Sequence, residues 1–327
     1  MLHPFTLQPI FKQRVWGGRA LASLYQKDLP PDMPVGESWE IADRSPDVNL
    51  ITNGPHAGRS LRWLMEDHPQ ELLGEATGNG GRFPLLVKLL DAQQVLSLQV
   101  HPPTNRARAL GGEPKTELWY VSHAAPGAEV LAGFHSPIDR ASFGKLLATG
   151  NAGPAIHRLP VQAGDALFLP SGRVHALGAG CVIFEIQQNS DTTYRVYDWN
   201  RPGVDGQPRE LHIEAALASI DFDDLRPALV QTPWTEHTGR RQRELTANPL
   251  FRVLEWEVGA DPVDLQGPNR PLVVGVIHGD IRIAHAASGE LVHARAGSFA
   301  LVPASARNSV LSGPGARVLV AEPGAGR

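Results

Sequence analysis

The sequence predicts a mainly β protein that consists of two related β-barrels and a few connecting helices. Three observations predict this fold class. The 327 residues include 33 glycines and 28 prolines. Their combined share of the chain is well above the average of about 12%, which indicates many turns. Short apolar runs lie between turn signals in both halves of the chain, as in sandwiches and barrels. A short segment of the first half also recurs in the second half, which indicates duplication.

Composition and charge exclude several classes of protein. Hydrophobic residues make up 42% of the chain, enough for a sizeable core. The formal net charge of −4 disfavours a broad nucleic-acid-binding surface, which needs a basic face. A single cysteine, Cys181, permits no intrachain disulfide. The first residues lack signal-peptide features, and apolar runs such as 84–90 are too short to span a bilayer. We therefore expect a cytoplasmic protein without a nucleic-acid or membrane partner.

The first half of the chain begins with short strands among turn signals, including one at 38–42. Ser60 can cap a helix that Pro69 divides and Gly74 ends, which predicts a helical insertion near 60–74. Beyond this helix, apolar runs separated by turns predict strands at 84–92, 95–102, 117–124 and 129–134.

A second helical insertion is predicted near 136–150, with Ser136 as its N-cap and Pro137 in its first position. Strands are then predicted at 157–162, 165–170, 175–179 and 181–188. The segment 211–220 is predicted to be helical. After residue 250, short strands return at 251–258, 272–279, 280–286, 299–304 and 317–322.

The recurring segment aligns GDALFLPSGRVH (164–175) with GSFALVPASARN (297–308). Each copy has a glycine, a proline six residues later, and a polar residue five after the proline. In the first copy Pro170 and Gly172 form a hairpin turn, and the next strand directs His175 into the barrel. In the second copy Asn308 stands in that place, and no His-x-His pair precedes it. We therefore expect that the second barrel has lost any metal site and is structural.

Four polar residues around this hairpin form a candidate metal site. Gln99 and His101 lie two apart on a predicted strand and so share one face of it. Glu117 lies on the next predicted strand, and Lys115 shares its face. With His175 they offer nitrogen and oxygen ligands without a thiolate, a set that suits Zn, Mn, Fe or Co. The alternative is that Gln99 and Glu117 are ordinary polar positions in half-buried strands and that His175 is a core histidine.

Several motifs resemble the short bacterial form of the type I phosphomannose isomerase family, within the cupin superfamily. They are RVWGG (14–18), GESWEIA (36–42), PLLVKLLDA (84–92), QVHP (99–102), KTELWYV (115–121), GDALFLPSGRVHALG (164–178) and EIQQNSDTTYRVYDWNR (185–201). The resemblance covers most of residues 1–201. It implies two cupin-like jelly-roll barrels: an N-terminal catalytic domain at 1–205, a helical linker at 206–245 and a C-terminal barrel at 246–327.

The resemblance also implies an activity and its residues. The activity is the interconversion of mannose 6-phosphate and fructose 6-phosphate with a zinc ion, other divalent metals being possible. The implied metal ligands are Gln99, His101, Glu117 and His175, and the family's proposed catalytic arginine falls on Arg195. The implied substrate is a hexose 6-phosphate. Trp16, Glu37 and Trp39 match family positions that line the pocket.

Isomerisation moves a proton between C1 and C2 and needs a base, an electrophile and a phosphate anchor. The base stays open among Glu185, Asp191, Lys115 and a metal-bound water. Arg195 can bind an oxyanion or a phosphate, and Arg201 is a weaker phosphate candidate. Lys88 and Ser97, on strands that lead to Gln99, are further substrate-binding candidates.

Two other functions compete with the isomerase. A metal-bearing sugar-phosphate binding or sensor protein needs no turnover, and another cupin enzyme, such as a metal oxygenase, uses a different reaction. The sequence does not reveal the oligomeric state.

Overall fold

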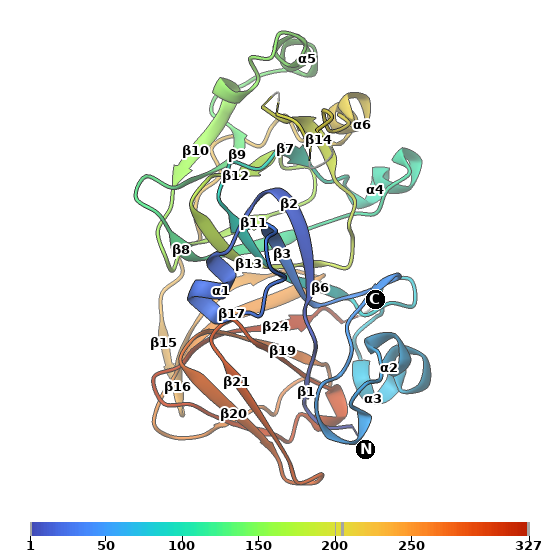
Figure 1. The fold of residues 1–327 in the computed structure, drawn as a ribbon, viewed down its shortest axis with the longest axis vertical. Helices are drawn as coiled ribbons and strands as arrows, with labels where there is room; N and C mark the ends of the chain where they lie inside the picture. The colour runs from blue at the N-terminus through green and yellow to red at the C-terminus, as the bar shows by residue number, and fades with distance from the viewer. Residues whose placement is uncertain (1, 200, 204–205, 326–327) are drawn as a thin grey trace.

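Two barrels of antiparallel strands, stacked one on the other, make up the fold (Figure 1). The computed structural model describes residues 2–199, 201–203 and 206–325. The barrel drawn at the top of Figure 1 is formed by the first two thirds of the chain and is called the N-terminal barrel below; the other is the C-terminal barrel. The prediction of a mainly β fold with two barrels is confirmed.

The N-terminal barrel contains a six-stranded sheet and a five-stranded sheet. The six-stranded sheet is made of β2 (Ile10–Gly18), β3 (Val35–Ile41), β6 (Leu85–Ala92), β8 (Glu117–Ala124), β11 (Ala166–Leu169) and β13 (Cys181–Gln188). The five-stranded sheet is made of β7 (Leu98–Val100), β9 (Glu129–Phe134), β10 (Ile156–Pro160), β12 (His175–Leu177) and β14 (Tyr194–Tyr197). The strand orders are β11-β8-β13-β6-β3-β2 and β10-β9-β12-β7-β14.

The C-terminal barrel contains a seven-stranded sheet and a four-stranded sheet. The larger sheet is made of β1 (Phe5–Thr6), β15 (Thr235–His237), β16 (Arg240–Ala247), β17 (Phe251–Val258), β19 (Leu272–His278), β22 (Phe299–Val302) and β24 (Arg317–Pro323). The smaller sheet is made of β18 (Val263–Asp264), β20 (Asp280–His285), β21 (Glu290–Arg295) and β23 (Val310–Ser312). The orders are β1-β22-β19-β24-β17-β16-β15 and β18-β23-β20-β21, and a separate ribbon pairs β4 (Asp43–Arg44) with β5 (Asp47–Val48).

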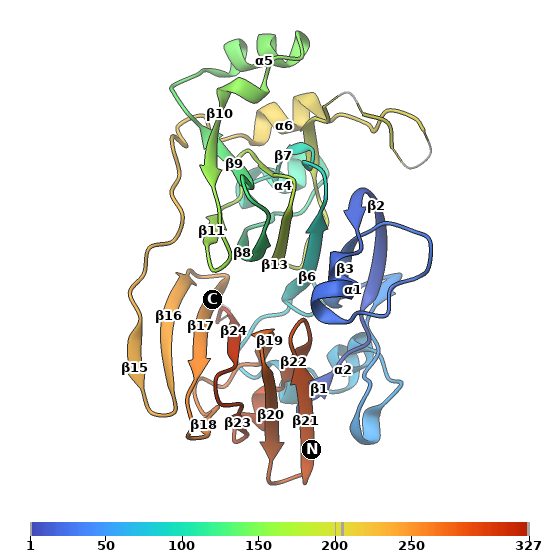
Figure 2. The ribbon, with the colours of Figure 1, turned by 60° about the vertical axis from the view of Figure 1, so that its left-hand side comes forward.

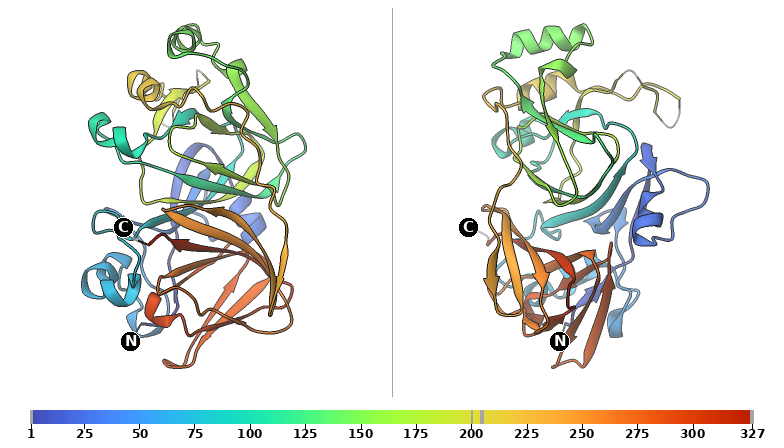
Figure 3. Two further views of the ribbon diagram at one scale, coloured as in Figure 1. Left: turned by 180° about the vertical axis from the view of Figure 1, so that it is seen from behind. Right: turned by 90° about the vertical axis from the view of Figure 1, so that its left-hand side faces the viewer.

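The helices are short and lie outside the barrels. They are α1 (Ala20–Tyr25), α2 (Leu61–Asp67), α3 (Pro69–Leu73), α4 (Thr104–Ala107), α5 (Arg140–Ala148) and α6 (Ile213–Ser219), with 3-10 turns at Gly54–His56, Arg108–Leu110, Gly153–Ala155 and Ala304–Ala306. Views from behind and from the side place α5 and α6 at the end of the N-terminal barrel away from its neighbour (Figure 3). Among the described residues, no helix is long and apolar enough to cross a membrane.

The predicted helix near 60–74 is confirmed, with its signals in the expected places. The Ser60 hydroxyl accepts a hydrogen bond from the backbone N–H of Trp63 at 3.1 Å, as an N-cap does. Pro69 opens α3 after a break, because it cannot continue the hydrogen bonding of α2. Gly74 follows with a φ of 56°, a left-handed conformation that glycine adopts without strain.

The N-cap predicted for the second helix is wrong. α5 begins at Arg140, and the Asp139 side chain accepts a hydrogen bond of 2.7 Å from the backbone N–H of Ser142. Asp139 rather than Ser136 caps the helix, because its carboxylate lies three residues before a free N–H and complements the positive end of the helix.

The segment expected to be a helical linker, 206–245, differs from that description. Among its described residues, α6 is the only α-helix, and the chain then runs down one side of the molecule to β15 (Figure 2). β15 and β16 already pair in the large C-terminal sheet, with Thr235 opposite Gln242. β16 consists mainly of charged and polar residues and contains no long apolar run, so the sequence gives little sign of this strand.

The repeated turn has the same backbone in both barrels up to its last residues. Gly164 and Gly297 both have a positive φ, of 98° and 77°, and each precedes a strand. The copies then diverge. His175 is buried in the first barrel, whereas Asn308 is exposed and accepts a hydrogen bond from His285 at 2.9 Å. Arg307, one residue earlier, is the buried side chain of the second copy.

The six-stranded sheet is buried on both faces because it separates two cores. Successive side chains of a strand point to opposite faces. On β8, Trp119 packs in the interior of the N-terminal barrel. Leu118 and Tyr120 pack in a core that the two barrels share, together with Phe299 of β22. The sheet is therefore a common wall, with one face toward the interior of the first barrel and one toward the second.

A buried carboxylate joins the barrels across this wall. Glu255 of β17 has no exposed surface and accepts a hydrogen bond from the Tyr120 hydroxyl at 2.8 Å. Its other oxygen accepts one from Arg243 Nε at 2.6 Å, and Arg243 also donates to the carbonyl of Gly164 at 2.5 Å. The contact fixes the position of β8 against the second barrel.

Removing the Tyr120 hydroxyl is expected to weaken this contact. Tyr120→Phe leaves one oxygen of the buried Glu255 without its donor, which should cost roughly 1–3 kcal/mol in the free energy of unfolding. Urea unfolding monitored by circular dichroism measures the loss. Tyr197→Phe is the matched control, since the described residues give the Tyr197 hydroxyl no hydrogen bond. Equal stability of the Tyr120 and Tyr197 variants would contradict the role given to Glu255.

Candidate functional site

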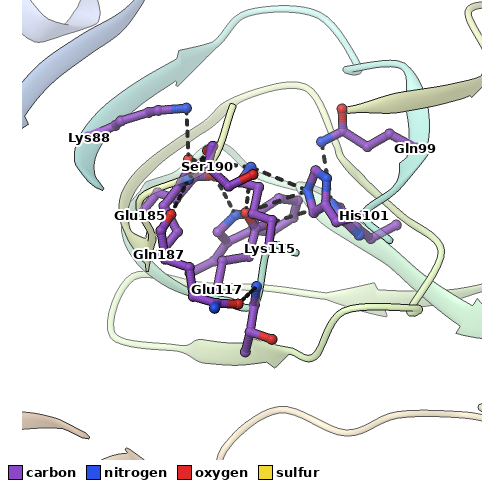
Figure 4. A network of polar contacts seen from close by, with 12 residues as sticks. Lys88, Gln99, His101, Lys115, Glu117, Glu185, Gln187 and Ser190 are labelled. Carbon is purple, nitrogen blue, oxygen red and sulfur yellow. Dashed lines mark hydrogen bonds and ion pairs between the residues drawn. The ribbon is translucent and has the colours of Figure 1, made fainter. Parts of the chain in front are cut away.

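A cavity of about 410 Å³ lies in the N-terminal barrel, between its two sheets and the loops around them. Nine of the residues predicted for the site line it: Trp16, Glu37, Lys88, Ser97, Gln99, Lys115, Glu185, Asp191 and Arg195. Ser97 and Gln99, two residues apart in the chain, both line it. His101, Glu117 and His175 form a buried group next to Gln99 and Lys115 (Figure 4).

The buried group comes from strand ends that the sheets bring together. His175, the first residue of β12, lies directly opposite Gln99 of β7. His101 follows the end of β7, and Glu117 is the first residue of β8. One ligand atom from each of His101, Glu117 and His175 lies within 4.8 Å of the other two. All three side chains are at most 2% exposed.

Backbone carbonyls orient both imidazoles. His101 Nδ1 lies 2.8 Å from the carbonyl oxygen of Thr192, and His175 Nδ1 lies 2.9 Å from that of Arg173. A carbonyl only accepts, so each Nδ1 must carry the proton and donate. Each Nε2 then presents a lone pair. The Lys115 ammonium donates to Nε2 of His101 at 3.2 Å, the Gln99 amide nitrogen lies 3.3 Å from Nε2 of His175, and the two Nε2 atoms lie 3.6 Å and 3.3 Å from the two oxygens of Glu117. Histidines that bind metals are oriented in this way.

Glu117 is an ionised carboxylate without exposure to water. Burial raises its pKa, but the charge of Lys115 is the largest of the opposing effects, and the pKa lies well below its ordinary value. Lys115 Nζ lies 2.7 Å from Glu117 Oε2. Neither Glu117 oxygen accepts a hydrogen bond of ordinary geometry from the described residues. The carboxylate thus has lone pairs available for a cation.

The protonation state of His101 favours metal binding, whereas Lys115 is a neighbouring cation. Burial, with the nearby Lys115 charge, lowers the pKa of His101 to about 3, so the imidazole is neutral at physiological pH. Burial alone would lower the pKa of Lys115, yet Glu117 and Glu185 raise it well above its ordinary value. The lysine therefore stays charged and does not act as a base.

Gln99 lies beside these three residues. Its amide nitrogen lies 3.3 Å from His175 Nε2. The oxygen and nitrogen of an amide have nearly the same shape, so rotation by 180° brings the oxygen to the same place. Two imidazoles, a carboxylate and an amide fit a divalent metal, with no thiolate.

A second charged group lies beside the first. Glu185 accepts a hydrogen bond from Trp119 Nε1 at 2.9 Å on one oxygen. Its other oxygen lies 3.3 Å from Lys88 Nζ and 4.0 Å from Lys115 Nζ. That oxygen accepts no hydrogen bond of ordinary geometry from the described residues. Glu185 therefore presents a free lone pair at the cavity wall, between two ammonium groups.

Glu37 holds the other side of Lys88. Burial raises the pKa of Glu37, but Lys88, Arg14 and the Trp39 indole outweigh it and lower the pKa to about 2. Arg14 Nε donates to Glu37 at 2.7 Å, and Trp39 Nε1 donates to its second oxygen at 2.7 Å. Glu37 is thus a fixed anion that orients two cations toward the cavity.

Arginines border the cavity on the side of β14. Arg195, Arg209 and Arg14 all line it. Burial, with repulsion from Arg209, lowers the pKa of Arg195, and the Arg195 Nε is buried without a hydrogen-bond acceptor. Asp198 holds Arg209 through bonds of 2.6 Å and 2.5 Å. An anion in the cavity would relieve this excess of positive charge.

The structure separates Arg201 from the other predicted residues. Arg201 does not line the cavity; it donates to Asp198 and to the carbonyl of Val95 at 2.5 Å. Arg209, which sequence reasoning missed, lines the cavity instead. It is one of 25 arginines, and no motif marks it. Arg14 lies in the RVWGG motif, but nothing in the sequence gave it a role.

Family comparison identifies the chemistry of related proteins. Residues 4–117 match the model of the family "Phosphomannose isomerase type I, catalytic domain". The chain is 36% identical over 307 residues to a probable mannose-6-phosphate isomerase of Bacillus subtilis, covering 93% of this chain and 94% of that protein. It is 37% identical over 284 residues to a mannose-6-phosphate isomerase of Streptococcus mutans, covering 86% and 87%.

Solved structures agree with these sequences. The crystal structure of the Bacillus subtilis mannose 6-phosphate isomerase superimposes with a TM-score of 0.88 at 29% identity, over 98% of this chain and 99% of that one. A variant of the Salmonella typhimurium phosphomannose isomerase superimposes with a TM-score of 0.80 at 18% identity, over 98% and 100%. At that identity the likeness supports the fold alone.

Removing one imidazole is expected to abolish metal binding. His101→Ala deletes a ligand from a buried site whose other groups cannot move into its place. Titration with Zn²⁺ by calorimetry, with circular dichroism to check the fold, measures the effect, and the affinity should fall at least 100-fold. His123→Ala, an exposed histidine on the same strand as Glu117, is the control. Unchanged Zn²⁺ affinity in His101→Ala would exclude this metal site.

Proposed function

The chain belongs to the type I phosphomannose isomerase family, and we propose that it interconverts mannose 6-phosphate and fructose 6-phosphate in the cavity of the N-terminal barrel. One observation carries the assignment to this cavity. A metal-ligand cluster, a buried carboxylate with a free oxygen and a border of arginines all meet there. These are the electrophile site, the proton carrier and the phosphate anchor that the reaction needs.

We propose that Gln99, His101, Glu117 and His175 hold Zn²⁺. The donor set of nitrogen and oxygen atoms and the carbonyl-oriented imidazoles support this choice, as in catalytic zinc sites. When bound, the metal would supply a Lewis acid that polarises the sugar oxygens. The catalytic unit is then the N-terminal barrel, and the C-terminal barrel supports it from outside.

We propose Glu185 as the residue that moves the proton between C1 and C2. Lys115 is held charged, so it can donate to an oxygen but cannot take the proton. Of the two carboxylates, Asp191 is exposed and Glu185 is buried beside the metal cluster. The free oxygen of Glu185 faces Lys88 and Lys115, which would stabilise negative charge on the neighbouring enediol oxygens.

The arginines on the side of β14 are the proposed phosphate anchor. A phosphate near Arg195 and Arg209 would supply the acceptor that Arg195 Nε lacks. Arg201 then acts only through Asp198, by fixing the carboxylate that orients Arg209. A hexose phosphate is charged and does not cross a bilayer unaided, so we place the reaction in the cytoplasm.

The isomerase assay on chelated and then repleted protein tests the function. Chelation with EDTA is expected to abolish conversion of mannose 6-phosphate, and Zn²⁺ should restore it more fully than Mn²⁺, Fe²⁺ or Co²⁺. A coupled assay that detects fructose 6-phosphate measures both steps. Full activity after chelation would reject the metal-dependent reaction, and fuller recovery with another ion would reject zinc as the metal.

Replacing the proposed proton carrier separates Glu185 from Asp191. Glu185→Gln should lower kcat by about 100-fold or more, because general acid–base groups contribute that much. It should also stop exchange of the C2 proton of mannose 6-phosphate with deuterated water, followed by NMR. Asp191→Asn should retain exchange. The reverse pattern would assign the proton to Asp191.

Replacing a proposed anchor should affect binding of the phosphate group. Arg209→Gln is expected to raise KM for mannose 6-phosphate about tenfold or more and to weaken inhibition by inorganic phosphate in parallel. Arg226→Gln, at an exposed position, is the control. Unchanged phosphate inhibition in Arg209→Gln would remove Arg209 from the anchor.

A further inference from the structure

The C-terminal barrel has an interior cavity of its own, separate from the proposed active site. It has a volume of about 140 Å³ and lies among β16, β17, β24 and the loop at 264–268. A protein cavity of about 150 Å³ is large enough for one six-membered ring. Leu254, Leu272 and Val320 form an apolar wall on one side.

Polar groups without partners lie beside these apolar residues, since Trp256 is two residues from Leu254 on β17 and shares its face of the sheet. Trp256 lines the cavity, is 5% exposed, and has its indole N–H buried without a hydrogen-bond acceptor among the described residues. A buried donor without an acceptor costs about 1–3 kcal/mol. Such a cost marks a place where a molecule that can accept a hydrogen bond would bind.

Arg240 supplies a cation at the same place. Its guanidinium lies over the Trp256 ring, 4.2 Å from the centroid, and its Nε donates to Gln242 at 2.9 Å. No carboxylate of the described residues forms an ion pair with it, and burial alone lowers its pKa. Its neighbour Arg241, on the opposite face of β16, has a carboxylate partner in Glu257 at 2.6 Å. Arg240 is thus a partly desolvated cation that lacks an anion.

The repeated turn delivers a third donor. Arg307, which aligns with the buried Val174 of the first copy, is also buried, and it lines the cavity. The carbonyl of Leu265, the carbonyl of Arg270 and the carboxylate of Glu322 hold its Nε and Nη1. Its Nη2 has no hydrogen-bond partner among the described residues. Glu322 neutralises this arginine and Glu244 pairs with Arg252. Arg240 is therefore the lining cation without an ion pair among the described residues, while Asp264 also lines the cavity.

We propose that this cavity binds a small monocarboxylate, with its apolar body against Leu254, Leu272 and Val320 and its carboxylate between Arg240 and the indole N–H of Trp256. The volume limits the body to about one ring. A singly charged carboxylate matches the single free cation. A phosphate dianion would instead meet Glu322 and lack an apolar part to cover the wall.

Titration of the full chain with benzoate tests the site. In ¹H–¹⁵N NMR spectra, the indole signal of Trp256, identified by its loss in Trp256→Phe, should move downfield and saturate as the N–H gains an acceptor. Arg240→Gln should weaken benzoate binding about tenfold or more, and Arg241→Gln on the other face should leave it unchanged.

A neutral probe supplies a second measurement that needs no variant. Benzyl alcohol has nearly the same shape and no charge, so it should bind at least tenfold more weakly than benzoate. Absence of a saturating shift of the Trp256 signal would overturn the site. Equal affinity for the two probes, or equal effects of the two arginine substitutions, would overturn its preference for a carboxylate. Isomerase activity of the same variants is measured separately. Failure of this binding site can then be told apart from failure of the proposed isomerase function.

Discussion

The burial of the Glu117 carboxylate is the constraint on which the N-terminal barrel depends. An ionised carboxylate away from water is costly unless cations and donors surround it. Lys115 supplies one charge at 2.7 Å, and two imidazoles face the oxygens with their lone pairs rather than their protons. The imidazoles therefore add no compensation by themselves, and they keep this orientation because carbonyls of Thr192 and Arg173 hold their other nitrogens. The barrel thus fixes an incompletely compensated anion in advance, which is the condition for binding a cation with little rearrangement.

The six-stranded sheet between the barrels links the position of Glu117 to the packing of the second barrel. Along β8, Glu117 and Trp119 face the site, whereas Leu118 and Tyr120 face the second barrel. The register of one strand therefore sets both the position of a metal ligand and the fit between the barrels. This arrangement gives the C-terminal barrel a physical role for which it needs no chemistry: Glu255 holds the Tyr120 hydroxyl and so limits movement of the strand that begins at Glu117.

Much of the fold and of the site could be predicted from local patterns. The strand pattern placed Gln99 on β7, because two-residue periodicity survives wherever a strand is regular, whereas His101, predicted on the same strand, lies just after its end. Ser60, Pro69 and Gly74 marked a helix because their effects act within a few residues.

Contacts between distant segments could not be predicted. Arg201 and Arg209 both pair with Asp198, but only Arg209 is directed toward the cavity. The direction depends on the fold of the chain around Asp198. β16 was missed because its exposed face is charged, and its place in a sheet depends on Trp256 and other residues that come later in the chain. Glu117 was predicted as a metal ligand mainly because its motif resembles that of a known family. Residue spacing alone did not distinguish it from an ordinary polar residue.

The pairing of β1 with β22 sets the order in which the chain can fold. Phe5 lies opposite Leu301, so a strand from the first residues closes a sheet made by the last hundred. Contacts of such sequence separation form late, because the loop between them must first be ordered. Phe5 and Leu7 also belong to the core shared with Phe184 and Leu319. During synthesis the N-terminal barrel would therefore have to wait, with one apolar wall uncovered, until the second barrel emerges. The two barrels resemble separate units in their topology, yet they complete their folding together.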